Sequence, residues 1–522
     1  MLKKIRVVLA LLFWIGITLL LLDVSGVLHG YLGWMAKVQF LPAVLALNVG
    51  VIVGLVVLTL LFGRVYCSVI CPLGVFQDGV SHLGTLGKKA PYKYRKELKW
   101  LRYGVLVLFV IALITGVQVF VALLAPYSAY GRMVQNLLQP LWLWGGNLIE
   151  SIAERSGSYL IYPREVWLRS LPTFIIAIAT LVVVVVLSFK GGRTYCNSIC
   201  PVGTTLSFFS RFAMFRPVID KGKCKHCKAC EHHCKAQCIS IGKEEQKIDY
   251  SRCVDCFNCI GSCKFDALHY RFAWNKEIHS AQNGPRYDKK RQTVIPSEAS
   301  VSPAAEPLAK PQNDNGRRAM LAGSAIALGS LALKGLPLKA QGRKKVDGGF
   351  AEVLPKEAPE RETPITPPGS RSVKDFYRHC TACQLCVAQC PNNVLRPSTD
   401  LEHLMQPEMS YEKGFCRPEC TRCSELCPAG AIRKIGKEQK TDYHIGTARV
   451  NRELCVAEDG TKCGKCAQVC PAGAIVMVEN PAMGNRIPTV NEEMCIGCGA
   501  CEFHCPSRPV SAITVNGKEV HV

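Results

Sequence analysis

The chain has few of the features that mark nucleic-acid binding, copper handling or signalling. Basic residues exceed acidic ones, 63 against 40, but no stripe interleaves basic with aromatic residues, so the net charge of +23 does not indicate nucleic acid. There are only 10 methionines and no Met- or His-rich tract of the kind that copper-handling proteins favour. No DNA-binding or kinase signature is present, which disfavours a redox sensor. The basic residues instead lie beside apolar segments and in linkers, as expected of a membrane protein.

Cysteine, in contrast, is abundant, and its spacing argues against a disulfide framework. The 522 residues contain 29 cysteines, which divide into six quartets, two pairs and the single Cys238. The regular quartets read C-x2-C-x2-C-x3-C, the run that binds [4Fe–4S] clusters, whereas zinc sites typically use two short pairs separated by a longer gap. We therefore predict six [4Fe–4S] clusters, whose use is to move electrons singly over a distance.

Residues 216–270 are predicted to form a two-cluster ferredoxin module. In such modules the fourth cysteine of each quartet ligates the other cluster. Lys235 and Lys264 stand where the common pattern has proline, and a lysine beside a cluster should favour its reduced state. Cys238 is interpreted as a packing residue. The expected ligand sets are Cys224, Cys227, Cys230 and Cys263 for one cluster, and Cys253, Cys256, Cys259 and Cys234 for the other.

Residues 373–522 are predicted to hold the other four clusters. The two regular quartets lie at the ends of this region and the two irregular ones in the middle, which favours nested pairing, with sequential pairing as the alternative. Because covalent ligation replaces much of the apolar core, loss of the clusters should unfold the region. Under nested pairing the sets are Cys380, Cys383, Cys386 and Cys505; Cys495, Cys498, Cys501 and Cys390; Cys416, Cys420, Cys423 and Cys470; and Cys455, Cys463, Cys466 and Cys427.

Four apolar runs predict an α-helical membrane domain over residues 1–215. Residues 5–22, 43–62, 104–125 and 172–189 are each long enough to cross about 30 Å of hydrocarbon. Lys and Arg concentrate before the first run and between the second and third, which predicts that both ends of the domain are cytoplasmic. The expected fold class is thus a membrane domain of four spans joined to α+β ferredoxin-like [4Fe–4S] modules.

An internal repeat follows the second and fourth apolar runs. The segments GRVYCSVICPLG (63–74) and GRTYCNSICPVG (192–203) share the pattern Arg-x-Tyr-Cys-x3-Cys-Pro. Their cysteines are interpreted as one converging site, either a thiol–disulfide relay, a metal site or the edge of a quinone pocket; the alternative is that they pack as small apolar groups. These cysteines are Cys67, Cys71, Cys196 and Cys200.

Acidic and histidine residues near the apolar runs are candidate proton acceptors for quinol oxidation, which releases two protons. Asp78 and His82 follow the first cysteine pair, and Asp23 and His29 lie at the other end of the apolar runs. Each is expected to be a solvated loop residue rather than a proton acceptor.

Residues 271–372 form the predicted linker between the modules. Its first part is polar and rich in Lys, Pro, Ala, Gln and Asn, which is typical of disorder. Residues 316–334 then contain Arg317 and Arg318 before a small, weakly hydrophobic run, the pattern of a twin-arginine export signal. Such a signal suits a folded, cluster-loaded domain and would carry the region 373–522 to the periplasm.

The two halves of the chain resemble two known families. Residues 1 to about 270 resemble the NapH family of membrane quinol dehydrogenase subunits, on the two C-x3-C-P pairs, the four spans and the two-cluster ferredoxin. Residues from about 315 resemble the NapG (MauM/NapG) periplasmic ferredoxins, on the export signal and the four quartets. The chain departs from these families in the internal position of that signal and in Lys235, Lys264 and Cys238.

The resemblance implies a quinol dehydrogenase component of the bacterial inner membrane. Electrons would pass from menaquinol or ubiquinol to a periplasmic oxidoreductase, such as a nitrate reductase, or to cytochrome c, with the module 216–270 in the cytoplasm and the region 373–522 in the periplasm. Two alternatives remain: a membrane ferredoxin that reduces metal ions or thiols during metalloenzyme assembly, and quinone-linked exchange with a cytoplasmic partner. Membrane lipid is an expected partner and nucleic acid is not.

Overall fold

The computed structural model describes residues 2–23, 26–86, 92–156, 164–242, 245–273, 353–480 and 484–521. Residues 1–273 and 345–522 belong to one compact unit. The predicted export segment 316–334, with Arg317 and Arg318, lies outside the described residues, as does most of the predicted linker. We refer below to the helical part (2–214), the ferredoxin module (215–273) and the C-terminal part (353–521).

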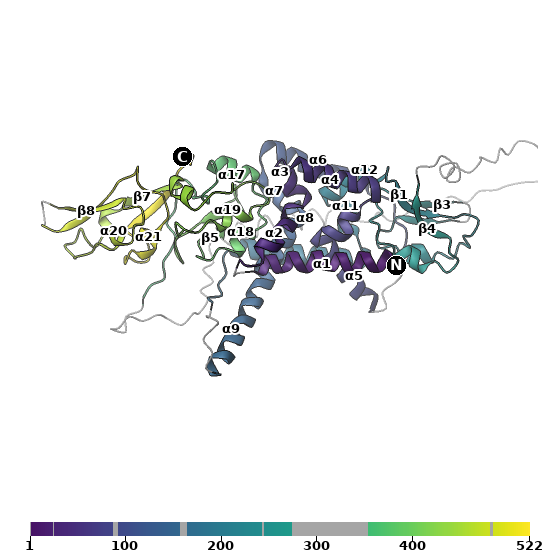
Figure 1. The fold of residues 1–522 in the computed structure, drawn as a ribbon, viewed down its shortest axis with the longest axis horizontal. Helices are drawn as coiled ribbons and strands as arrows, with labels where there is room; N and C mark the ends of the chain where they lie inside the picture. Colours follow the sequence, from purple (N-terminus) through teal and green to yellow (C-terminus); the bar gives the residue numbers. More distant parts are fainter. Residues whose placement is uncertain are drawn as a thin grey trace, which may run out of the picture. The chain divides into compact units, whose positions relative to one another are not determined.

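The helical part is a set of helices of unequal length (Figure 1). Glycine, proline and asparagine stand at several of the breaks between them, as at Asn48, Pro72 and Gly116. Its π-helical turns are η1 (Tyr66–Ile70) and η2 (Val134–Leu138). Its helices are α1 (Leu2–Leu22), α2 (His29–Lys37), α3 (Phe40–Leu45), α4 (Val49–Phe62), α5 (Pro72–Leu86), α6 (Lys99–Thr115), α7 (Gln118–Leu124), α8 (Pro126–Met133), α9 (Gln139–Arg155), α10 (Leu171–Gly191), α11 (Thr194–Ser198) and α12 (Pro201–Ser210).

The prediction of four continuous spans is wrong for two of the four runs. Among the described residues, α1 and α10 are the helices long and apolar enough to cross a membrane, and α4 is a shorter apolar helix. The second run breaks before α4, where the Asn48 side chain accepts a hydrogen bond from the backbone N–H of Val51 and caps the helix. The third run breaks at Gly116, whose φ of 79° ends α6 in the left-handed conformation.

The ferredoxin module consists of two antiparallel strand pairs and two short helices. The strands β1 (Phe215–Ile219) and β4 (Leu268–Phe272) pair antiparallel, and β2 (Ile239–Ile241) pairs with β3 (Gln246–Ile248). The helices α13 (Ala229–His232) and α14 (Asn258–Ser262) each contain the third cysteine of a quartet. Pairing of the first and last strands closes the module around its cysteines.

The C-terminal part repeats this design with three further strand pairs. Short helices again contain or adjoin the clustered cysteines, and the strand pairs β5–β6, β8–β9 and β7–β10 are antiparallel. Its elements are α17 (Val373–His379), α18 (Leu385–Ala388), β5 (Leu395–Pro397), β6 (Pro407–Met409), α19 (Arg422–Leu426), η4 (Glu438–Asp442), β7 (Gly446–Val450), η5 (Arg452–Leu454), α20 (Lys465–Gln468), β8 (Ile475–Glu479), β9 (Arg486–Val490), α21 (Ala500–His504) and β10 (Ile513–Gly517).

One buried apolar cluster runs through all three parts. It includes Leu20 and Tyr130 of the helical part, Val254 of the ferredoxin module, and Cys383 and Leu426 of the C-terminal part. A second cluster, around Tyr411 and Val515, lies within the C-terminal part. Both cysteine-rich parts are therefore packed onto the helical part through buried side chains.

Candidate iron–sulfur sites

The four regular quartets share one backbone conformation, which their common spacing imposes. In each of them the residues directly before and directly after the second cysteine have positive φ. Left-handed residues cost free energy unless the surrounding structure needs them, and their alternation with right-handed residues turns successive backbone N–H groups toward one point. The flanking pairs are His226 and Lys228, Asp255 and Phe257, Ala382 and Gln384, and Gly497 and Gly499.

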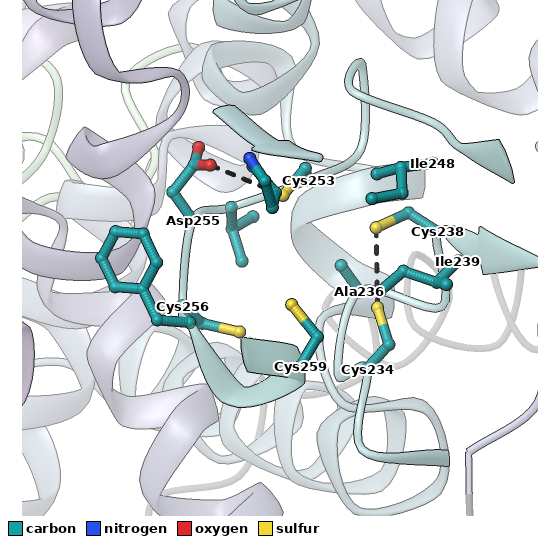
Figure 2. Close-up of a pocket in the computed structure, with 12 residues that line it drawn as sticks. Cys234, Ala236, Cys238, Ile239, Ile248, Cys253, Asp255, Cys256 and Cys259 are labelled. Carbon is teal, nitrogen blue, oxygen red and sulfur yellow. Dashed lines mark hydrogen bonds between the residues drawn. The ribbon is translucent and has the colours of Figure 1, made fainter. Parts of the chain in front are cut away.

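In the ferredoxin module the structure brings together both of the expected ligand sets. The Cys253 set (Cys253, Cys256, Cys259 and Cys234) lines one pocket, and the Cys224 set (Cys224, Cys227, Cys230 and Cys263) lines another. Figure 2 shows the sulfur atoms of Cys234, Cys256 and Cys259 facing the first pocket. The fourth cysteine of each quartet thus lies with the other quartet, as cubane ligation requires.

Cys238 is also part of the wall of the first pocket. Its Sγ atom lies 3.5 Å from that of Cys234, as the dashed line in Figure 2 marks. The thiol is buried and hydrogen-bonds a predicted ligand, so Cys238 is more than the packing residue that its position in the pattern indicated.

In the C-terminal part the structure overturns the nested pairing. Cys427 packs with Cys380 and Cys386, and it lies within electrostatic reach of Cys383; we call these four the Cys383 set. Cys390 lines a pocket with Cys416, Cys420 and Cys423, the Cys416 set, and not with Cys495. The first two quartets therefore exchange their fourth cysteines with each other.

The last two quartets are arranged in the same way. Cys470 lines a pocket with Cys495, Cys498 and Cys501, the Cys495 set, rather than with Cys416. Cys455, Cys463 and Cys466 lie together, and exchange leaves Cys505 as their fourth member. The pairing is sequential, because quartets that follow each other in the chain also adjoin in space.

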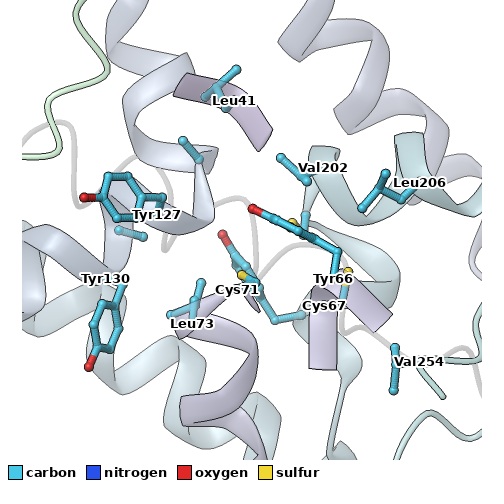
Figure 3. Packing of buried hydrophobic residues seen from close by; sticks show 14 of the residues in the cluster. Leu41, Tyr66, Cys67, Cys71, Leu73, Tyr127, Tyr130, Val202, Leu206 and Val254 are labelled. Atoms are coloured by element: carbon cyan, nitrogen blue, oxygen red, sulfur yellow. The ribbon is translucent and has the colours of Figure 1, made fainter. Parts of the chain in front are cut away.

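The paired-motif cysteines Cys67, Cys71, Cys196 and Cys200 converge in the core of the helical part. All four are buried, with exposed fractions of 4%. Figure 3 shows Cys67 and Cys71 among the side chains of Tyr66, Leu73 and Val202. Every pair among the four thiols lies within electrostatic reach.

Two fully buried arginines cross between the repeats. Arg64, from the first copy, donates to the backbone carbonyl of Cys196 at 3.3 Å and approaches the Sγ atom of Cys67 at 3.7 Å. Arg193, from the second copy, donates to the carbonyl of Cys67 at 2.6 Å and approaches the Sγ atom of Cys196 at 3.9 Å. In each repeat, the arginine thus donates a hydrogen bond to the backbone carbonyl of the first cysteine of the other repeat.

The glycines of the repeat make this crossing possible. A Cβ atom on Gly74 would collide with the carbonyl of Cys67 and the guanidinium of Arg193. A Cβ atom on Gly203 would collide with the carbonyl of Cys196 and the guanidinium of Arg64. The repeat in the sequence is therefore a repeat in space, although the role of its arginines did not follow from the pattern.

Asp78 is not a solvated loop residue, contrary to the prediction. It lies on α5, is buried, and forms ion pairs with Arg6, with Arg193 at 2.8 Å and with Lys235 of the ferredoxin module at 3.4 Å. Burying a carboxylate is costly unless it is paired, and here three cations surround it. The repeat offered no signal for it, because the corresponding position of the second copy holds Ser207.

The other acid–base residues are bound into local structure. Both carboxylate oxygens of Asp23 accept backbone N–H groups, from Gly26 and Leu28, as an end-of-helix turn. His29 begins α2, where its ring lies against Gly33. The described residues thus provide no reason to assign Asp23 or His29 to proton transfer.

The two cysteine-rich parts contact opposite ends of α10. At one end of α10, Arg169 donates to the carbonyl of Val387 in the C-terminal part, and at the other end Arg193 donates from its backbone to Lys235 of the ferredoxin module. The 21 residues of α10 span about 30 Å. At the end of α1, the carbonyl of Leu20 accepts from Gln389 at 2.6 Å.

Buried amides strengthen the contact with the C-terminal part. Asn136 donates to the side chain of Gln384 at 3.1 Å, and Gln139 donates to the carbonyl of Ala388 at 3.1 Å. Gly131 on α8 leaves room for the carbonyl of Cys383, with which a Cβ atom would collide. The Cys383 set therefore lies directly against the helical part.

Comparison with known proteins supports iron–sulfur binding. Residues 44–91 and 173–219 match a family described as a 4Fe-4S binding domain, and residues 461–508 match a 4Fe-4S dicluster domain. The methylamine utilization ferredoxin-type protein MauM of Methylorubrum extorquens is 33% identical over 207 residues, which are 38% of this chain and 87% of that protein. The chain belongs to the MauM ferredoxin-type family.

Two further relatives are also similar to this chain. The ferredoxin-type protein NapF of Escherichia coli is 28% identical over 34% of this chain and 99% of its own length. An uncharacterised protein of Methanocaldococcus jannaschii is 29% identical over 41% of this chain and 67% of its own length. Together with the MauM match and the domain matches, they establish an iron–sulfur protein of the ferredoxin type that transfers electrons.

The residues fit [4Fe–4S] clusters, since each of the four pockets described above brings together four cysteines in the arrangement of a cubane ligand set, with Cys238 as a fifth in the first pocket, and peptide N–H groups face sulfur atoms of two of the sets. Ala267 donates to the Sγ atom of Cys263 at 3.3 Å, and Ala448 donates to that of Cys495 at 3.4 Å. Within the described residues no three ligating side chains converge tightly enough for a single metal ion, and a cubane, with its irons at separate corners, does not need that. Hydrogen bonds to the sulfurs are a main way in which a protein tunes the potential of a cluster.

Proposed function

We propose that this protein carries electrons from a quinol in the bacterial inner membrane to an oxidoreductase in the periplasm. The observation that carries the proposal is that the ferredoxin module and the C-terminal part contact opposite ends of α10, a helix of membrane-spanning length. A chain of clusters that transfers electrons from one side of a bilayer to the other needs this arrangement.

The surface of the long helices supports a membrane location. Large apolar side chains of α1, α6 and α10 are exposed in rows, and such extended apolar surface is not found on ordinary water-soluble monomers. In a bilayer the same side chains would face lipid. They are Val8, Leu12 and Ile15 on α1; Val107, Val110, Ile111 and Ile114 on α6; and Ile178, Val182, Val183 and Val186 on α10.

In this proposal menaquinol or ubiquinol is oxidised at the helical part, and each molecule gives up two electrons and two protons. Clusters accept one electron at a time, so the two electrons leave in succession. Six [4Fe–4S] clusters, two in the ferredoxin module and four in the C-terminal part, would be held by the sets described above. The acceptor would be a periplasmic oxidoreductase, such as a nitrate reductase, or a cytochrome c, reached after export directed by residues 316–334.

The location is tested by proteolysis of a C-terminal epitope tag on the full chain. We expect digestion in intact spheroplasts and protection in inverted vesicles, as a periplasmic C-terminal part requires. Protection in spheroplasts with digestion in inverted vesicles would refute the periplasmic placement and favour exchange with a cytoplasmic partner.

The activity is tested with the purified, cluster-loaded protein in anaerobic proteoliposomes. Adding a menaquinol analogue should bleach the visible cluster absorption and produce the electron paramagnetic resonance signals of reduced clusters. A protein that dithionite reduces but quinol does not, with either menaquinol or ubiquinol analogues, would refute the quinol link while leaving the iron–sulfur assignment intact.

A further inference from the structure

The paired-motif cysteines lie where an electron route between the two cysteine-rich parts needs an intermediate. These parts contact ends of α10 that are about 30 Å apart. Electron tunnelling slows exponentially with distance, so direct transfer over that length would be far slower than transfer through a redox centre in between. The helical part must therefore contribute such a centre if electrons cross it.

Neither matched segment of the helical part can hold a cluster alone. The segment 44–91 contains Cys67 and Cys71, and the segment 173–219 contains Cys196 and Cys200, whereas a cubane takes four cysteine ligands. The crossed contacts of Arg64 and Arg193 bring the two pairs together as one group of four buried thiols. The peptide N–H of Gly203 also donates to the Sγ atom of Cys200, at 3.4 Å.

The charges around these cysteines call for an anion. Within the described residues Arg64 is fully buried, and its guanidinium hydrogen-bonds Asn197, two backbone carbonyls and the Cys67 thiol but forms no ion pair. The Asp255 carboxylate lies within electrostatic reach, but it accepts the backbone N–H of Arg64 rather than the guanidinium. The Nε atom of Arg64 and one Nη atom of Arg193 are buried there without a hydrogen-bond partner. Buried cations are costly unless paired, and a cubane with four thiolate ligands carries net negative charge.

The site also adjoins a cluster set on each side. The backbone N–H of Arg64 donates to Asp255 of the Cys253 set's loop at 3.0 Å, and Asn197 donates to the carbonyl of Ala236 at 3.2 Å. Toward the C-terminal part, the buried Arg132 lies within electrostatic reach of two residues. One is Tyr195, which precedes Cys196, and the other is Cys383. The paired-motif cysteines thus lie between the Cys253 set and the Cys383 set.

We infer that Cys67, Cys71, Cys196 and Cys200 together bind one further [4Fe–4S] cluster, shared between the two repeats, which relays electrons across the helical part. The cluster takes one electron from its neighbour on one side, becoming reduced, and returns to the oxidised state by passing that electron to its neighbour on the other. No proton or bond change is needed. Only the direction of flow rests on the proposed function; the ligand set does not.

The test is the iron content of the full chain, purified anaerobically from membranes. Seven cubanes give about 28 iron atoms per chain and six give about 24. Replacing Cys67→Ala or Cys196→Ala should remove about four iron atoms and one reduced-cluster resonance signal. Ser68→Ala is the matched control, because Ser68 is buried in the same turn between the two cysteines, and it should retain the full iron content.

A wild-type content near 24 iron atoms, unchanged by Cys67→Ala, would overturn the inference and leave the four thiols as a structural group or a disulfide relay. Should the variants not reach the membrane, the wild-type iron count and the number of centres in a redox titration still decide between six and seven. Failure of quinol to reduce the protein, with seven clusters present, would refute the proposed function and not this ligand set.

Discussion

The ferredoxin module and the C-terminal part differ in how far their cluster sites are exposed. In the module there is a gradient, because the Cys253 set is mostly buried against the helical part, whereas the Cys224 set includes the exposed Cys227. The C-terminal part has no such gradient: Cys380 and Cys383 of the inner set and Cys455 and Cys505 of the outer set are buried, and the other two cysteines of each set are partly exposed. The module therefore has one protected and one exposed site, whereas the C-terminal part protects its inner and outer sites to the same degree.

The largest effect is expected from breaking the sequential pairing. If Cys390 and Cys416 ligate the same cluster, Cys390→Ala, Cys416→Ala and the double variant should each lose about four iron atoms. The matched control Cys390→Ala/Cys498→Ala removes ligands of two clusters and should lose about eight. Nested pairing requires the opposite result for the two double variants, so iron analysis of the full chain distinguishes them.

A smaller effect is expected where the Cys383 set meets the helical part. Alanine is the better helix former by about 1 kcal/mol, so a harmful effect of Gly131→Ala must come from the collision with the Cys383 carbonyl. We expect several-fold slower reduction of the C-terminal clusters by quinol. Gly145→Ala on α9, where a Cβ atom meets open space, should have no such effect. Equal rates in both variants would show that this contact does not carry electrons.

The two lysines that replace proline allow inner and outer sites to be compared directly. Lys235 is mostly buried beside Asp78, whereas Lys264 is exposed, so water and salt screen the charge of Lys264 more strongly. Lys235→Gln should make the potential of the neighbouring cluster more negative by tens of mV, and Lys264→Gln should have a smaller effect. Redox titration followed by electron paramagnetic resonance measures both; a larger shift for Lys264→Gln would contradict the exposure gradient.

The smallest effect is a pH dependence in the C-terminal part. Burial lowers the pKa of His521 from 6.5, and its imidazole donates from Nδ1 to the carbonyl of Ser370 at 3.0 Å. Below pH 6.5, His521 binds a proton in the unfolded chain but stays neutral in the folded protein, because its folded pKa is lower. The free energy of unfolding therefore falls as the pH drops toward the folded pKa. His521→Asn should flatten that slope in thermal melts followed by cluster absorption. An unchanged slope would assign the dependence to other groups.

The sequence was sufficient where the chemistry is local. The spacing of the module's quartets, together with exchange of the fourth cysteine, gave the Cys224 and Cys253 sets that the structure brings together. The sequence was insufficient for the C-terminal part. The spacing within a quartet depends on the length of a local loop, and it carries no information on which other quartet supplies the fourth cysteine. Regular spacing at the two ends therefore said nothing about contact between them.

The same limit applies to the helical part. Hydropathy identified α1 and α10, but the other two apolar runs are interrupted at Asn48 and Gly116, where capping chemistry outweighs mean hydropathy. Asp78 looked like a loop residue because its partners are distant in the chain: Arg6, Arg193 and Lys235. A buried charge is recognised by its partners, and their proximity is a property of the tertiary structure.

The crossed arginines also impose an order on biosynthesis. Cys196 lies 129 residues after Cys67, so the first repeat is synthesised before the second repeat that it contacts. A ribosome needs roughly ten seconds to synthesise those residues. During that time Arg64 lacks the carbonyl of Cys196 that it later binds, and α10 has not been made. A cluster held by all four of these cysteines can therefore be completed only after the last long helix has been made.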